Sequence, residues 1–320
     1  MDQSAPKPEN IIHDTPDNPA PENATAGYFE TRDNKKLRYA IFRSSVTRAS
    51  GTVVLLQGRN ETIEKYYETI RDLTDAGLWV ATFDWRGQGG SERLLKNSIA
   101  GHVQRFSDYE DDLEYFLENI VLPDARLPFF IIGHSTGSLI ALSAAPRLAN
   151  RVEKMALSAP FVGMQDGRFG EPMLRFMVGA ASMFGFGRKS PTGNKRSNLV
   201  FEGNSLTSDR QRFARNRAIY DTCPDFILGG PTFRWLSECF RAMKRVHRPA
   251  HLASIRIPTL LLGAGADTIV PIETVEELAS HFRASELITI DHAQHELFQE
   301  ADIFREQVMA AIKAFMPGEL

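Results

Sequence analysis

Short runs of apolar residues recur along the chain at intervals that suit alternating strands and helices. Several runs are apolar at consecutive positions, as expected of strands buried on both faces of a parallel sheet. A turn at Asp33-Asn34 joins an additional pair of strands near the start of the chain. The predicted strands span residues 28–31, 36–42, 52–56, 78–83, 129–132, 154–158, 259–262 and 287–290.

Between most of these strands, apolar residues recur every three or four positions, which indicates amphipathic helices. In residues 62–76 the apolar positions include Ile63, Tyr66, Ile70 and Leu73. The same spacing predicts helices at 109–117, 138–148, 272–282 and 297–315. Strands that alternate with helices form a parallel sheet with right-handed crossovers. The chain is therefore predicted to be an α/β protein with a mostly parallel, doubly wound sheet.

The alternation of strands and helices fails across residues 161–250. This segment lies between two strand–helix units, so it is predicted to be an insertion at one end of the sheet. It holds fifteen Lys and Arg against seven Asp and Glu, a net charge of +8, whereas the whole chain carries −3 and the remainder therefore −11. The basic residues can be solvated helix faces, or they can attract an anionic substrate or a membrane surface.

Composition narrows the classes of protein to which this chain can belong. Residues 1–26 hold five prolines, and we expect a disordered or loosely packed arm there because they can bury little apolar surface. No apolar stretch approaches the ~18 residues of a membrane span, and the arm lacks the features of a secretory signal. Two cysteines, Cys223 and Cys239, exclude a disulfide scaffold and a four-cysteine zinc site. We therefore expect a soluble, cytoplasmic protein, and its charge argues against nucleic-acid binding.

Gly133-His134-Ser135-Thr136-Gly137 places a serine between a predicted strand and a predicted helix. A serine at such a tight turn takes a strained backbone, and glycine on either side removes side chains that would obstruct the turn. The turn holds the hydroxyl above the sheet, at the positive end of the following helix. Ser135 is therefore the candidate nucleophile, and a glycine–serine turn without catalysis is the alternative.

A serine hydroxyl becomes nucleophilic with the help of a base, and the base needs a carboxylate to orient it. Asp267 follows the strand predicted at 259–262, and His295 follows the strand predicted at 287–290. The carboxyl ends of parallel strands are where such sheets build their sites. The sequence therefore offers Asp267 as the orienting acid and His295 as the base.

Other side chains compete for these two roles. Asp267 can instead form a turn or a helix cap before Pro271, and His292 is a rival base because it lies nearer the end of its strand. His134 belongs to the serine motif, but we expect its ring to point away from Ser135. No group of residues has the spacing of a metal site. We therefore expect neither a metal nor a cofactor.

Acyl transfer also needs N–H donors for the oxygen that becomes negative in the transition state. The backbone N–H of Thr136 is one candidate. The backbone N–H of Arg59 is the second, because Gln57-Gly58-Arg59-Asn60 directly follows a predicted strand and Gly58 lets the chain turn toward the site. A plain glycine turn is the alternative reading of this loop.

A glycine-rich run, Asp84-Trp85-Arg86-Gly87-Gln88-Gly89-Gly90-Ser91, follows the strand predicted at 78–83. It lacks the Gly-Lys-Ser/Thr ending of a phosphate-binding loop, which argues against a nucleotide site. A structural role is the remaining interpretation. We expect Asp84 and Arg86 to form hydrogen bonds that hold loops near the site in place.

These motifs resemble those of the serine-hydrolase branch of the α/β-hydrolase superfamily, and more closely those of bacterial lysophospholipases and monoacylglycerol lipases. The likeness covers about residues 27–316, and it is carried by residues 57–61, 84–91, 133–137, Asp267 and His295-Glu296-Leu297. Many relatives begin the oxyanion loop with His-Gly, where this chain has Gln-Gly. The resemblance implies an α/β-hydrolase core at 27–160 and 251–320 with a helical cap at 161–250.

The resemblance and the motifs together predict a serine hydrolase that cleaves esters of monoacyl lipids, either a lysophospholipid or a monoacylglycerol. We expect the basic cap to contact a membrane surface peripherally, and we expect the lipid ester to be the small-molecule partner. The side chains predicted to line an acyl pocket are Phe161, Met164, Phe169, Met173, Leu174, Phe176, Met177, Met183, Phe184 and Phe186. The alternatives are a small-ester esterase, a peptidase, or a non-catalytic binding protein with the same fold.

Overall fold

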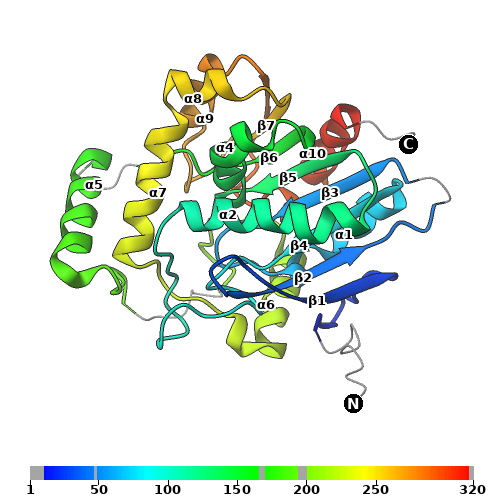
Figure 1. The fold of residues 1–320 in the computed structure, drawn as a ribbon, viewed down its shortest axis with the longest axis horizontal. Helices are drawn as coiled ribbons and strands as arrows, with labels where there is room; N and C mark the ends of the chain where they lie inside the picture. The colour runs from blue at the N-terminus through cyan, green and yellow to red at the C-terminus, as the bar shows by residue number, and fades with distance from the viewer. Residues whose placement is uncertain (1–10, 47–48, 166–169, 194–199, 317–320) are drawn as a thin grey trace.

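A computed structural model describes residues 11–46, 49–165, 170–193 and 200–316. Within these residues, eight strands form one sheet in the order β1-β2-β4-β3-β5-β6-β7-β8 (Figure 1). β2 runs antiparallel to both of its neighbours, and the strands from β4 to β8 are parallel. The mostly parallel sheet predicted from the sequence is confirmed. The strands are β1 (Ala24–Glu30), β2 (Lys36–Phe42), β3 (Gly51–Leu56), β4 (Leu78–Phe83), β5 (Phe129–His134), β6 (Val152–Ser158), β7 (Thr259–Ala264) and β8 (Ser285–Ile290).

Helices cover both faces of this sheet. Successive strand residues point to opposite faces, so Val53 and Leu55 pack with α1 and α10, whereas Val54 and Leu56 pack with α2 and α4. The consecutive apolar positions in the sequence thus reflect strands that are buried on both sides. The helices of this part are η2 (Ile63–Tyr66), α1 (Tyr67–Asp75), α2 (Ser107–Phe116), η3 (Leu117–Val121), α3 (Leu122–Asp124), α4 (Thr136–Leu148), α9 (Ile272–His281), η6 (Leu297–Gln299) and α10 (Asp302–Phe315).

A helical insertion follows β6 and ends before β7, and its described residues contain no strand. In Figure 1, α5 and α7 lie at one side of the molecule, beyond the sheet, and α6 lies below it. The inserted helices are α5 (Gly170–Ala181), η4 (Ser182–Phe186), α6 (Arg210–Thr222), η5 (Pro224–Phe226), α7 (Phe233–Val246) and α8 (Pro249–Ser254). The bounds 161 and 250 for a separate cap domain remain a prediction.

Ion pairs attach α6 to the core. Arg212 and Arg215 both pair with the carboxylate of Glu68 on α1, with N–O distances of 2.6 Å each. Arg212 also pairs with Asp302 at the start of α10, at 2.7 Å. Several arginines of the basic insertion are therefore neutralised by carboxylates of the acidic core.

The chain just before α6 is tied to the loop after β8. The N–H of Glu296 donates to the carbonyl oxygen of Leu206 at 2.8 Å, and the Thr207 hydroxyl donates to the Gln299 carbonyl at 2.7 Å. The Ser208 N–H donates to the carboxylate of Glu300 at 2.9 Å. One part of the insertion is thus hydrogen-bonded directly to the loop that carries His295.

Two sequence expectations differ from the structure. Residues 11–26 are not a loose arm, because Ile11 and Ile12 are only 3% and 4% exposed and Asn18 donates a side-chain hydrogen bond to the Glu64 carbonyl. Residues 1–10 lie outside the described part of the chain. The helix predicted at 297–315 is interrupted at Glu300, whose backbone is extended and whose carboxylate accepts N–H groups on both sides of the break.

Replacing Glu68 with Gln should lower the free energy of unfolding by about 1–2 kcal/mol at neutral pH, because the arginines lose their anionic partner. Burial raises the pKa of Glu68, but Arg212 and Arg305 outweigh it, and the pKa falls to about 2. A lowered folded-state pKa means that this stabilisation is present above about pH 4.5 and is lost as the pH falls toward 2. Urea unfolding of the wild type and of Glu68→Gln between about pH 3 and pH 7 measures this pH-dependent difference in stability.

The matched control is Glu202→Gln. It removes an exposed carboxylate that pairs with Arg210 of α6, the helix that also carries Arg212 and Arg215. This change should leave the urea midpoint of unfolding the same as that of the wild type at every pH, because water screens an exposed ion pair. If Glu68→Gln unfolded at the same urea concentration as the wild type at neutral pH, the ion pairs of α6 would contribute nothing to stability.

Candidate active site

Ser135 occupies a strained turn between β5 and α4. Its φ is +50° and its ψ is −115°, in a region that residues other than glycine rarely adopt. The flanking strand and helix fix the turn, and the Ser135 N–H donates to the Ser158 carbonyl at 2.9 Å. Such strain persists only where the surroundings enforce it, and it is typical of functional sites.

The two glycines of the serine motif are required by close packing. A Cβ atom at Gly137 would lie 2.3 Å from the carbonyl oxygen of Leu56, and one at Gly133 would lie 3.0 Å from the Cα of Ser138. The first turn of α4 therefore packs directly against the end of β3. This contact brings Ser135 next to the loop that follows β3.

Ser135, His295 and Asp267 lie together although they are far apart in the sequence. His295 Nε2 is 2.9 Å from the Ser135 hydroxyl oxygen, and His295 Nδ1 is 2.6 Å from Asp267 Oδ2. All three side chains are buried or nearly so. The other oxygen of Asp267 accepts the N–H groups of Ile269 and Val270, so the turn and the histidine hold one carboxylate. Asp267 thus does what both sequence interpretations expected, because it forms a turn with one oxygen and contacts His295 with the other.

The rival histidines do not reach Ser135 in this way. His292 is exposed and has a positive φ of 64°. His134 is buried, its ring lies 5.0 Å from that of His295, and its Nε2 lies 3.6 Å from Glu61. Burial lowers the pKa of His134 to about 3, so its imidazole is neutral at physiological pH.

The loop after β3 is held by hydrogen bonds at almost every backbone group. The Trp85 indole N–H donates to the Gln57 carbonyl at 2.9 Å, and the Glu61 carboxylate accepts the Gly58 N–H. Gln88 donates to the Gly58 carbonyl at 2.9 Å and accepts the Asn60 N–H at 3.2 Å. The Trp85 and Gln88 side chains of the glycine-rich run thus hold the loop.

The two predicted oxyanion donors line the same pocket as Ser135. Within the described residues, the Arg59 N–H donates to no acceptor, while the N–H groups on both sides of it are engaged. The Thr136 N–H is in the first turn of α4 and has no acceptor within its helix. The guanidinium of Arg59 donates to the Gly229 carbonyl and lies 5.5 Å from the Trp235 ring. Burial lowers the pKa of Arg59 to about 10, so it stays charged at neutral pH.

The roles expected for Asp84 and Arg86 fit the structure only in part. Asp84 accepts the N–H of Ile63 at 3.1 Å, next to the loop after β3. Arg86 instead pairs with Asp112 and Asp33, away from the pocket, so its predicted role is wrong. The sequence revealed that this run is structural but did not reveal which side chains reach the site.

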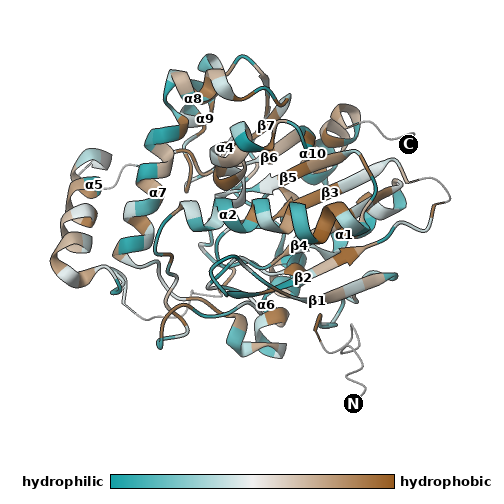
Figure 2. Ribbon diagram, in the orientation of Figure 1, coloured by the Kyte–Doolittle hydropathy of each residue, from teal (hydrophilic) through white to brown (hydrophobic). Residues whose placement is uncertain are grey.

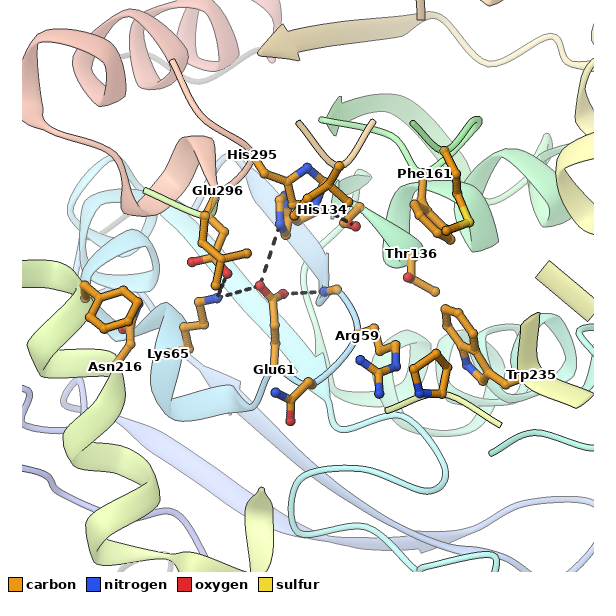
Figure 3. A pocket seen from close by; sticks show the side chains of 18 of the residues that line it. Arg59, Glu61, Lys65, His134, Thr136, Phe161, Asn216, Trp235, His295 and Glu296 are labelled. Carbon is orange, nitrogen blue, oxygen red and sulfur yellow. Dashed lines mark hydrogen bonds and ion pairs between the residues drawn. The ribbon is translucent and has the colours of Figure 1, made fainter. Parts of the chain in front are cut away.

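A cavity of about 340 Å³ is lined by Ser135, Thr136 and His295. Figure 3 shows other residues of its lining. One side of it is polar and includes Glu61, Lys65, Asn216 and Glu296. Arg59, Asn60, Arg217 and Tyr220 also line the cavity. The apolar side chains of the lining are Phe161, Met164, Leu206, Phe213, Pro231, Trp235, Leu236 and Ile269. In Figure 3, Phe161 and Trp235 lie on the opposite side of the cavity from Lys65, Asn216 and Glu296, so the pocket presents both apolar and polar groups to a substrate.

Of the predicted acyl-pocket side chains that the structure describes, Phe161 and Met164 line this cavity and the others do not. Leu174 packs against the core, and Phe169 lies outside the described residues. The other candidates are exposed on α5 and η4: Met173, Phe176, Met177, Met183, Phe184 and Phe186. The sequence missed Trp235 and Leu236 on α7. The helical spacing of buried residues on α7 was a usable signal, but it does not tell which of them face the pocket.

Within the described residues, no three His, Cys, Asp or Glu side chains come close enough to hold a metal ion. No helix of the described chain is long and apolar enough to cross a membrane.

Comparison with known proteins places the chain in a family. Residues 47–302 match the profile of the serine aminopeptidase S33 family, so the chain belongs to this family of α/β-hydrolases. Lysophospholipase L2 of Escherichia coli is 33% identical, over 88% of this chain and 84% of the relative. A protein of Haemophilus influenzae named probable lysophospholipase L2 is 30% identical, over 90% of this chain and 91% of the relative.

Solved structures share the same fold. A soluble variant of monoglyceride lipase from Saccharomyces cerevisiae aligns with a TM-score of 0.73 at 20% identity, covering 97% of this chain and 98% of the other. A monoacylglycerol lipase from Paleococcus ferrophilus aligns with a TM-score of 0.69 at 22% identity, covering 87% of this chain and 97% of the other. The predicted α/β-hydrolase fold with an inserted helical region is confirmed.

Replacing Gly137 with Ala should abolish activity and destabilise the fold by about 3 kcal/mol or more, since the new Cβ would collide with backbone carbonyl groups. Thermal unfolding and hydrolysis of a soluble ester measure both effects. The matched control is Gly179→Ala on α5, where no atom lies within 4 Å of the added Cβ. This control should be neutral or slightly stabilising. An active, stable Gly137→Ala protein would contradict the packing described above.

Proposed function

We propose that this protein is a serine hydrolase that cleaves the carboxylic ester of monoacyl lipids through an acyl-enzyme. The observation that carries the proposal is the chain of contacts from Asp267 through His295 to Ser135, at 2.6 and 2.9 Å, within a pocket of mixed polarity. The names of its relatives, lysophospholipases and monoacylglycerol lipases, support the same substrate class.

The proposed reaction has two steps. His295 Nε2 accepts the proton of the Ser135 hydroxyl as its oxygen attacks the ester carbonyl, and Asp267 stabilises the resulting imidazolium. The alcohol then leaves with the proton from His295. Water attacks the acyl-enzyme with His295 again as the base, which releases the fatty acid and restores Ser135. The N–H groups of Thr136 and Arg59 are the proposed donors to the oxyanion in both steps.

The shape of the pocket supports a substrate with one apolar chain and one polar head. Phe161, Met164 and Trp235 form part of an apolar wall that suits an acyl chain, while Lys65 and Asn216 belong to a polar wall that suits a glycerol-based head. A short acetyl ester would leave the apolar wall unfilled. We therefore propose a preference for medium or long acyl chains over acetyl.

Peptide hydrolysis is the rival activity, because the family is named for a serine aminopeptidase. The same nucleophile and base can act on an amide. An aminopeptidase needs an anionic group near the site to bind the substrate's amino terminus. Glu61 and Glu296 are such groups in this pocket, but Lys65 pairs with both of them. This pairing favours the ester substrate.

We further propose that α5 and η4 contact an anionic lipid surface. Phe176, Met183 and Phe184 are 73%, 75% and 73% exposed, and Figure 2 shows brown tones along the lower part of α5 at the outer edge of the molecule. The exposed cations Arg188 and Lys189 follow directly and suit negatively charged headgroups.

Replacing Ser135 with Ala should reduce hydrolysis of a lysophospholipid and of a monoacylglycerol by roughly 10⁴-fold or more while the protein stays folded. The matched control is Ser280→Ala, which removes a surface hydroxyl on α9 and should have no effect. The same assay includes esters from acetyl to palmitoyl and aminoacyl amides. Wild-type-like turnover by Ser135→Ala excludes the mechanism, and a strict acetyl or amide preference excludes the lipid substrate.

Replacing Phe176 and Phe184 together with Ser should weaken binding to vesicles of phosphatidylethanolamine and phosphatidylglycerol by about tenfold or more, because two exposed rings no longer enter the lipid. Vesicle co-sedimentation at low and high salt measures this, and added salt should weaken wild-type binding. Ile303→Ser, an exposed apolar residue on α10, is the control. Absent or salt-insensitive wild-type binding, or an equal loss with Ile303→Ser, would contradict the proposal.

A further inference from the structure

Two loops of the candidate site meet at one buried ammonium group. Lys65 is on η2, only 6% exposed, and its Nζ donates to Glu61 Oε1 at 2.7 Å and to Glu296 Oε1 at 2.6 Å (Figure 3). Glu61 closes the loop that carries the Arg59 N–H. Glu296 directly follows His295. A single side chain therefore joins the loop of the proposed oxyanion donor to the loop of the proposed base.

Glu61 extends this connection to the backbone of the oxyanion loop. Its Oε2 accepts the N–H of Gly58 and the hydroxyl of Tyr66, the latter at 2.6 Å. Its Oε1 also faces His134 Nε2 at 3.6 Å, and His134 precedes Ser135. The carboxylate of Glu61 thus holds the Gln57–Gly58 peptide group, one peptide before the group that bears the Arg59 N–H, and it lies against the residue before Ser135.

The charges in this cluster favour the ionised lysine. Burial opposes the positive charge of Lys65, but Glu296 and Glu61 outweigh it and raise the pKa of Lys65 above its usual value. Burial also raises the pKa of Glu61, but Lys65 lowers it by more, and the resulting pKa is about 2. For Glu296 burial prevails and its pKa is raised. Loss of the ammonium would leave two buried carboxylates without their common counter-charge.

We propose that Lys65 is a positioning residue, whose two ion pairs hold the oxyanion loop and the histidine loop at a fixed separation around Ser135. This proposal rests on the proposed function only in assigning the donor to Arg59 and the base to His295. A shift of either loop would misalign groups that must act on one carbonyl carbon. Misplacement by about 1 Å is sufficient to cost about 100-fold in rate.

Lys65→Met keeps most of the side-chain volume and removes the charge. On p-nitrophenyl butyrate, which has no lipid head group, kcat should fall by about 10- to 100-fold while KM changes by less than about threefold. The same loss should occur with a lysophospholipid. Lys65→Arg restores a cation with several donors and should recover kcat to within about fivefold of the wild type. Lys154→Met, which removes a part-buried lysine that donates to the Phe315 carbonyl far from the pocket, is the control and should be neutral.

Other roles for Lys65 give different results. If it only bound the head group, KM would rise for the lysophospholipid and kcat on p-nitrophenyl butyrate would not change. If it only stabilised the fold, the melting temperature would fall with kcat intact. Either result overturns the proposal. Should Lys65→Met not fold, Glu296→Gln tests the same link, with a severalfold lower kcat expected and an unchanged kcat contradicting it.

The soluble ester separates this test from the proposed lipid activity. A wild-type protein that hydrolyses p-nitrophenyl butyrate but no lipid would overturn the substrate assignment and leave the Lys65 measurement intact. Ester turnover that survives Ser135→Ala would instead overturn the proposed mechanism before any Lys65 variant is interpreted.

Discussion

The close approach of α4 to the end of β3 is the constraint on which the site depends. The carbonyl groups of Leu56 and Gln57 occupy the space that a side chain at position 137 would need. Only glycine allows the contact, and the contact fixes Ser135 and Thr136 relative to the loop after β3. The geometry around Ser135 is therefore set by the packing of a helix on a sheet, which is far stiffer than an exposed loop.

Around this contact, buried polar groups serve more than one purpose. The carboxylate of Asp267 holds a turn with one oxygen and His295 with the other. The carboxylate of Glu61 accepts donors from the backbone of its own loop, from Tyr66 and from Lys65. Buried polar groups are costly unless they are fully paired. Because these side chains share hydrogen-bond partners, a substitution at one of them disturbs the others. The site lies beneath the insertion and not on an open surface, so water cannot easily replace a lost partner.

The sequence predicted the sheet, five helices that alternate with its strands, and the positions of Ser135, Asp267 and His295 at strand ends, because each depends on local patterns: apolar runs, glycines at a turn and residues at strand ends. It failed where distant residues decide the outcome. Ile11 and Ile12 are buried by a neighbouring part of the fold that proline content does not reveal. The last helix is interrupted at Glu300, whose carboxylate accepts the N–H of Ser208, over 90 residues away, as well as N–H groups on both sides of the break. The aromatic and methionine residues of α5 look like a pocket lining by composition, but their exposure depends on how α5 packs on α7.

The insertion is attached unevenly to the body of the protein. On one side, α6 is bound by ion pairs to α1 and α10, and the segment before it is hydrogen-bonded to the histidine loop. On the other side, α5 packs on α7 at the edge of the molecule and exposes its rings. A movement that widened the pocket from the α6 side would disturb His295 itself. The exposed phenylalanines therefore belong to the part of the insertion that rests on α7, and a contact made there would leave the hydrogen bonds to the histidine loop in place.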